Sequence, residues 1–247
     1  GLQHLAVAVA VAPAEEGLPT RVLTCGTFCF ASSLESTHSI RSLPELEGLP
    51  LKAIESGAFH ACALTDRGVA YTWGHEAGFD LSNGNLLGQG PPSADLTVFP
   101  LTVSQPPRRV NARGLGPIAE VRCSTYSSMA ITMDGRVFTW GDSDGGALGH
   151  TVTPCHSPVR VGGELHAVCV GHGSMSYTNA AVATEDGRCF VWGGGAWEGG
   201  IAASGQSNAP AEVRGWSGIP PHYKCSAISL GQKHGYLVFG KRAGPPA

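Results

Sequence analysis

A short pattern of glycine, hydrophobic residues, Asp-Gly and Trp-Gly recurs along this chain, and it constrains the fold more than any other feature. A glycine precedes a tryptophan by five residues in three places: Gly68 and Trp73, Gly135 and Trp140, and Gly187 and Trp192. Successive sites lie 48, 67 and 52 residues apart when Cys25 is counted at the tryptophan position. Fixed motifs at variable spacing are typical of repeats that differ only in their loops.

Each copy of the pattern is predicted to form a β-hairpin. The tetrads T-D-R-G, M-D-G-R and E-D-G-R, at 65–68, 133–136 and 185–188, lie between hydrophobic stretches. Glycine next to aspartate supplies the positive φ that tight hairpin turns need. Further strands are predicted at 51–57 and 119–123, and three to four strands per repeated unit predict an all-β protein built as a β-propeller.

Composition agrees with a chain of short strands and tight turns. Glycine contributes 35 of 247 residues, and only 14% of the residues are charged, against about 25% in an average protein. A hydrophobic fraction of 42% is enough for a core and excludes disorder of the highly charged kind. The net charge of −3 gives no strong nucleic-acid signal, and no apolar run is long enough for a membrane span.

Eight cysteines are present, and only Cys25 and Cys29 lie close together. No second pair completes a zinc set, so we expect buried thiols in a reducing compartment. The predicted location is intracellular, in the cytoplasm, the cytoskeleton or the nucleus, with an organelle left open. Since the chain starts with Gly1 and not Met, we expect it to be cut from a longer polypeptide.

The string G-x-x-H, D-G and W-G resembles the regulator of chromosome condensation repeat, and so do the glycine-rich tails at 85–90 and 145–149. Tyr126 takes the histidine position in one copy, and Cys25 takes a tryptophan position.

The resemblance implies a propeller of seven blades. We expect about four blades plus a partial fifth, with the other blades on the same polypeptide or supplied by a partner; a closed ring of four or five blades is the less favoured alternative. The whole chain, 1–247, is then one propeller or part of one, with approximate repeats at 1–56, 57–122, 123–170, 171–230 and 231–247.

Residues that recur in every repeat are predicted to be structural. A repeated histidine is expected to bond the backbone between strands, and the repeated tryptophans are expected in the core between blades. The glycine after each tryptophan is expected where a Cβ would crowd the neighbouring sheet. These structural residues are His4, His60, His234, Trp73, Gly74, Trp140, Gly141, Trp192 and Gly193.

No catalytic motif is recognisable. Asp66, Asp134 and Asp186 fall in predicted turns, where aspartate is favoured for its backbone geometry, so they suggest no acid–base pair. The segment 142–145 could begin a calcium loop, but the later ligands are missing. We therefore predict no enzymatic activity, no catalytic residue, no cofactor and no metal.

Two long insertions, 75–117 and 194–223, are expected to leave the blades and to carry binding, as loops on rigid scaffolds often do. The candidate partner contacts in them are Arg108, Arg109, Trp197 and Trp216. The favoured hypothesis is a non-enzymatic protein-interaction scaffold within a larger protein or assembly. The alternative, which the resemblance implies, is a guanine-nucleotide exchange factor for a Ran-like small GTPase.

Overall fold

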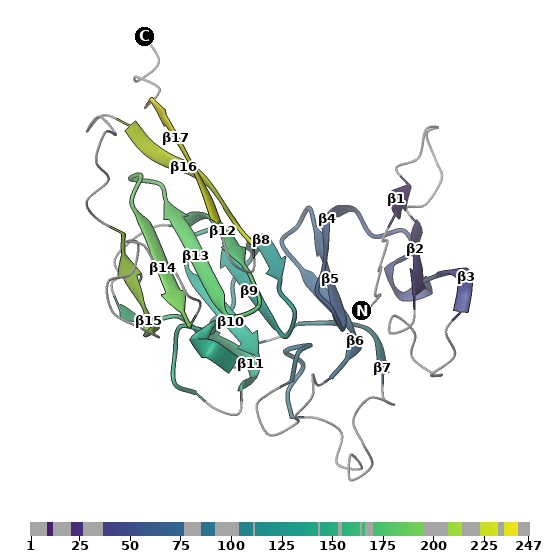
Figure 1. Ribbon diagram of the computed structural model, residues 1–247. Helices are drawn as coiled ribbons and strands as arrows, with labels where there is room; N and C mark the ends of the chain where they lie inside the picture. Colours follow the sequence, from purple (N-terminus) through teal and green to yellow (C-terminus); the bar gives the residue numbers. More distant parts are fainter. Residues whose placement is uncertain are drawn as a thin grey trace.

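The protein is an all-β arc of antiparallel sheets (Figure 1). The computed structural model describes residues 9–11, 21–26, 37–76, 85–91, 104–110, 112–142, 144–152, 155–163, 165, 170–194, 207–213, 223–231 and 235–241. Within these ranges five sheets follow one another along the chain, in agreement with the predicted four blades and partial fifth. No helix in the described ranges is long and apolar enough to cross a membrane.

The five sheets are numbered here in chain order. Sheet 1 contains β1 (Val9–Val11), β2 (Arg21–Gly26) and β3 (Thr37–Ser42). Sheet 2 contains β4 (Leu51–Ser56), β5 (His60–Thr65), β6 (Ala70–His75) and β7 (Ser104–Arg109). Sheet 3 contains β8 (Ile118–Cys123), β9 (Ser127–Thr132), β10 (Val137–Gly141) and β11 (Cys155–Arg160). Sheet 4 contains β12 (Val170–Met175), β13 (Asn179–Thr184), β14 (Cys189–Gly193) and β15 (Ser207–Glu212). Sheet 5 contains β16 (Tyr223–Leu230) and β17 (Gly235–Lys241). Two short 3₁₀ turns, η1 (Pro44–Leu46) and η3 (Asp144–Gly146), lie in the connections.

The predicted hairpins join the second and third strands of sheets 2, 3 and 4. Their turn glycines, Gly68, Gly135 and Gly187, have φ angles of 76°, 76° and 90°. Only glycine adopts this backbone region without strain, which confirms the predicted turns. The first strands β4, β8, β12 and β16 lie beside one another, so the sheets radiate from one side of the arc.

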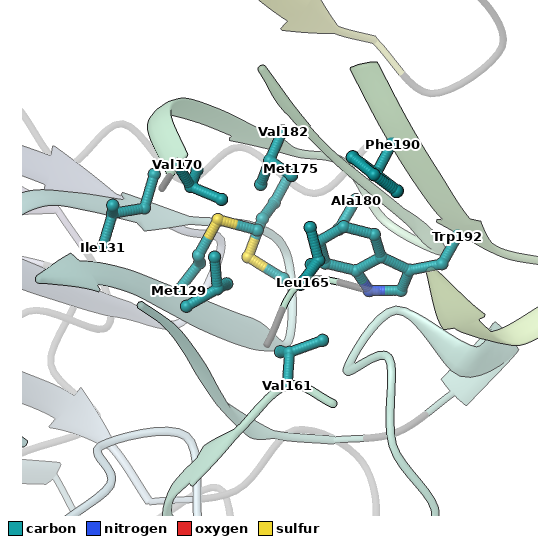
Figure 2. Packing of buried hydrophobic residues seen from close by; sticks show 11 residues of the cluster. Met129, Ile131, Val161, Leu165, Val170, Met175, Ala180, Val182, Phe190 and Trp192 are labelled. Atoms are coloured by element: carbon teal, nitrogen blue, oxygen red, sulfur yellow. The ribbon is translucent and has the colours of Figure 1, made fainter. Parts of the chain in front are cut away.

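The hydrophobic core lies between the sheets. Figure 2 shows one interface, where Met129 and Ile131 of sheet 3 pack against Val182 and Trp192 of sheet 4. Comparable clusters join sheet 1 to sheet 2, sheet 2 to sheet 3 and sheet 4 to sheet 5. Because each sheet buries its faces against its neighbours, the arrangement is that of propeller blades.

The tryptophans of the repeat lie in these interfaces and also bond across them. The Trp140 indole Nε1 donates to the Leu86 carbonyl at 3.1 Å, and the Trp192 Nε1 donates to the Ala147 carbonyl at 2.9 Å. Both acceptors lie in the glycine-rich tail that follows the preceding Trp-Gly. Trp73 is 2% exposed and packs with sheet 1. Each of these two glycine-rich tails thus links its own sheet to the next through a hydrogen bond.

The strand register corrects two details of the sequence alignment. His60 is paired with Gly74, and the residue paired with Gly141 in the same way is Ser127, one place after Tyr126. Tyr126 instead corresponds to Phe59 and stacks on it, with ring centroids 5.3 Å apart. Placing Tyr126 at the histidine position was therefore wrong by one residue, since Ser127 takes that place.

The glycines after the tryptophans are required for a different reason from the one predicted. A Cβ on Gly74, Gly141 or Gly193 would lie 2.6, 2.5 or 2.1 Å from a carbonyl oxygen of the residue just before the neighbouring strand of the same sheet, and not against another sheet. All three also have φ between 107° and 109°. Both the space and the backbone conformation therefore require glycine.

The two predicted insertions are shorter than expected. Residues 104–109 form β7 and residues 207–212 form β15, and each is the outermost strand of its sheet. Pro106 and Pro107 fit there because an edge strand needs no complete set of amide donors. Arg108 and Arg109 consequently lie on a blade strand, not on a loop outside the blade.

Candidate interaction surface

The buried polar residues of the repeat bond within the arc. The His60 side chain is 4% exposed, and its Nε2 lies 2.7 Å from the Ser128 hydroxyl of the adjacent sheet. The histidine therefore links two sheets through a side chain, where a backbone partner was predicted. His4, His234, Trp197 and Trp216 lie outside the described residues.

A charged network runs along the first strands of the sheets. Arg122 on β8 bonds Glu55 on β4 at 2.7 Å and Glu120 on its own strand at 2.5 Å, and its Nε donates to the Gly173 carbonyl on β12. His172 on β12 lies 3.1 Å from Glu120 and 3.3 Å from the Ile228 carbonyl on β16. Burial raises the pKa of Glu55, although Arg122 opposes the shift. Since each of these charged groups has a partner, the network joins four sheets and leaves none of them free for chemistry.

Four of the five described thiols are buried, and Cys123 is partly buried. Cys62 and Cys123 lie together between sheets 2 and 3, and the hydrogen bond that the Cys62 thiol donates to Cys123, together with burial, raises the pKa of Cys62 and lowers that of Cys123. Burial raises the pKa of Cys155 to about 11. Cys62 and Cys155 therefore stay protonated at neutral pH, and a protonated thiol is a poor nucleophile and a poor metal ligand. No group of three or more His, Cys, Asp or Glu in the described ranges could hold a metal ion.

The turn carboxylates are also accounted for structurally. Asp134 is bonded by the Thr132 hydroxyl and pairs with Arg136 at 2.7 Å. The hydrogen bond from Arg136 lowers the pKa of Asp134. Asp186 makes the same contacts with Thr184 and Arg188. These repeated bonds stabilise the hairpin turns, and they do not bring two carboxylates together.

Among the side chains that the structure describes, the arginines without an ion-pair partner gather at one place, the hairpin end of sheets 2 and 3. We call it the arginine rim and define it by five arginines: Arg67, Arg108, Arg109, Arg113 and Arg160. All five are exposed. In the described part of the chain none of them lies within ion-pairing distance of a carboxylate or makes a hydrogen bond through its guanidinium.

The strand pairing places these arginines near one another. Arg109 is paired with Tyr71, at the start of the strand that follows the Arg67 turn. Arg113 lies in the turn just after β7, and the Arg136 guanidinium of sheet 3 bonds the Gly114 carbonyl in that turn at 2.9 Å. Arg160 is paired with Phe138, over whose ring Arg136 lies at 5.8 Å. The rim is therefore continuous from sheet 2 to sheet 3.

The sequence found only part of this surface. Arg108 and Arg109 were singled out as an adjacent pair, but Arg67, Arg113 and Arg160 were not. The sequence could not identify the other three arginines, because only the strand register shows which positions of different sheets are equivalent. Arg109 and Arg160 occupy the same place in successive outer strands, opposite Tyr71 and Phe138.

Comparisons with known proteins agree with the geometry. Residues 134–175 and 51–77 match two models described as the Regulator of chromosome condensation (RCC1) repeat. RUG3, a mitochondrial RCC1 domain-containing protein of Arabidopsis thaliana, is 28% identical over 66% of this chain and 35% of its own length. The ultraviolet-B receptor UVR8 of the same plant is 25% identical over 80% of this chain and 41% of its own. The chain thus spans about two fifths or less of these relatives.

Solved structures give the same fold. Human WBSCR16 superposes with a TM-score of 0.66 at 21% identity, over 90% of this chain and 57% of its own. Prp20p from Saccharomyces cerevisiae has a TM-score of 0.68 at 14% identity, over 91% of this chain and 52% of its own. Identities this low establish the fold alone, and they confirm the predicted propeller architecture.

Proposed function

This chain belongs to the RCC1 repeat family, and we propose that it is a non-enzymatic protein-interaction module. One observation carries the proposal. The repeated tryptophans, histidine and turn carboxylates are engaged within or between sheets, whereas the arginine rim is exposed and has no ion-pair partner among the described residues. Exposed guanidinium groups without an ion-pair partner in the described part of the chain are available for a partner. Arginine is also enriched at protein interfaces.

The proposal is tested by site-specific photo-crosslinking. A photoreactive benzoylphenylalanine replaces Arg109 in one variant and Val152 in another, because Val152 is exposed and precedes β11 at the end opposite Arg160. We expect a discrete set of crosslinked proteins from the position-109 variant and none of these from the position-152 variant. Each captured protein is then purified and must bind the unmodified chain. Equal crosslinking at both positions, or none at position 109, would contradict the proposal.

The exchange-factor alternative rests on fold likeness alone. Prp20p, whose structure was reported with its binding to Gsp1p and histones, is only 14% identical. No described residue of this chain carries a role transferred from it. Release of labelled guanine nucleotide from purified small GTPases separates the alternatives, because a scaffold binds without accelerating release.

The compartment stays a prediction. The sequence favours the cytoplasm, the cytoskeleton or the nucleus and leaves an organelle open. The mitochondrial name of RUG3 supports keeping the organelle among the candidates.

A further inference from the structure

The charge pattern of the arginine rim specifies the chemistry of its partner. We infer that the rim binds an acidic protein segment, rich in glutamate or aspartate, that crosses sheets 2 and 3. The inference rests on the proposed function, because it names the partner class of the same surface.

The rim has an excess of positive charge that the chain as a whole lacks. Arg136 is paired with Asp134, and two further carboxylates lie at this end, Glu45 on η1 and Asp66 in the Arg67 turn. Among the described residues neither of these two has an arginine within ion-pairing distance. Among the described residues, with Arg136 included, six arginines against three carboxylates leave an excess of three positive charges, in a chain whose net charge is −3. An acidic ligand would therefore be attracted to this end of the molecule.

The positive surface ends at sheet 4. The outer-strand position held by Arg109 in sheet 2 and Arg160 in sheet 3 is held by Glu212 in sheet 4, opposite Phe190. The hairpin turn of sheet 4 also exposes Glu185 and Asp186, and of these two Asp186 is paired with an arginine. The sign at the equivalent outer-strand position thus reverses within one repeat, and the described charges at this end of sheet 4, three carboxylates against Arg188 and Lys224, carry no positive excess.

This boundary favours a short acidic protein segment over a nucleic acid. A duplex carries one phosphate charge per about 1.7 Å of its axis, so it would continue onto the acidic turn of sheet 4. A short segment can instead place its carboxylates on two sheets and end there. Guanidinium groups match carboxylates through paired, parallel hydrogen bonds, which gives the pairing geometry as well as attraction.

Fluorescence anisotropy tests the inference. The probe is a fluorescein-labelled peptide rich in glutamate, and the matched peptide has glutamine at every glutamate position. We expect the intact chain to bind the glutamate peptide and not the glutamine peptide, and to bind more weakly as salt is raised. The double variant R109E/R160E should weaken binding about tenfold, because it removes two attractive pairs and adds two repulsive ones.

Two control variants separate charge from folding. R109K/R160K keeps both positive charges but loses the paired guanidinium hydrogen bonds, so its affinity should lie between those of the intact chain and R109E/R160E. K224E reverses one positive charge, half the change made in R109E/R160E, on β16 of sheet 5, and its affinity should stay near that of the intact chain. Equal affinity for both peptides, or no loss in R109E/R160E, would overturn the inference.

Failure of this inference is distinguishable from failure of the proposed function. If labelled duplex DNA binds more tightly than the glutamate peptide at equal salt, and R109E/R160E abolishes that binding, the rim is a nucleic-acid surface and the acidic-segment inference is wrong. If position 109 crosslinks proteins while the glutamate peptide fails to bind, the interaction module stands and only its partner class is refuted.

Discussion

At the scale of single residues, the glycine after each tryptophan shows how the backbone limits the sequence. Gly141 has a φ of 107°, and a Cβ on it would lie 2.5 Å from the Tyr126 carbonyl oxygen. Gly90 has nearly the same φ, 102°, but a Cβ there would meet nothing within 4 Å. The two positions therefore share the conformational strain and differ in the steric clash.

We expect G141A to destabilise the fold more than G90A does. The positive φ costs an alanine about 1–3 kcal/mol at either position, and the clash at Gly141 adds about 2 kcal/mol. Urea denaturation followed by tryptophan fluorescence gives both free energies of unfolding. Equal losses in the two variants would mean that strand pairing at Gly141 relaxes to admit a Cβ.

At the scale of elements, the first strands of the sheets are joined by charges as well as by packing. The Arg122 side chain is 27% exposed, and those of Glu55 and Glu120 are 31% and 14% exposed. Without the guanidinium, the partly buried Glu55 carboxylate would lose its ion-pair partner and Glu120 would keep only His172. Removing one partner of such a group costs more than the net stabilisation of the pair, because the remaining charge stays desolvated.

We expect R122M to lower the free energy of unfolding by about 1–3 kcal/mol at pH 7, less than for a fully buried pair because of the partial exposure. Removing Arg122 adds to the upward shift that burial already imposes on the pKa of Glu55. A carboxyl group whose pKa is higher in the folded than in the unfolded protein favours the folded state at pH values below the unfolded pKa. It destabilises the folded state as the pH rises above that value. The variant should therefore be closer to the parent at pH 4 than at pH 7, as urea titrations at both pH values would show.

The double variant E55Q/R122M is the control for this prediction. The E55Q change replaces the carboxylate that R122M leaves without an ion-pair partner with a neutral amide, so it should recover part of the stability lost in R122M. A loss in R122M that is the same at both pH values and is not relieved by E55Q would indicate lost packing of the arginine stem and not unpaired charge.

At the scale of the whole molecule, stability is expected to vary along the arc. Sheet 3 packs against sheets 2 and 4, and all six residues of its strand β9 are buried. On β17 of sheet 5, Tyr236 and Val238 are 68% and 55% exposed. In a repeat protein each unit is stabilised mainly by its direct neighbours, so these two regions should open with different free energies.

Hydrogen exchange with peptide-level mass spectrometry measures this difference. We expect peptides covering β9 to exchange slowest and peptides covering β17 to exchange faster by more than tenfold, which corresponds to about 1.4 kcal/mol. Exchange of both strands at one rate would show that the arc unfolds as a single cooperative unit.

The sequence by itself determined the repeat, the hairpin turns and the propeller class. These follow from local chemistry: Asp-Gly selects the turn, alternation selects the strand, and Trp-Gly marks its end. The repeat boundaries and the seven-blade expectation stay predictions. The equivalence of Tyr126 and His60 was wrong, because an alignment by letters cannot detect a register that only strand pairing defines.

Only the tertiary structure decided which residues meet. Arg67, Arg109 and Arg160 are up to 93 residues apart in the chain, and they come together because equivalent positions of successive sheets share one rim. The segment with Arg108 and Arg109 read as a loop, since two prolines precede it, yet it is an edge strand that tolerates them. Local sequence determines how each blade folds, whereas the stacking of blades determines which surface charges remain without a partner.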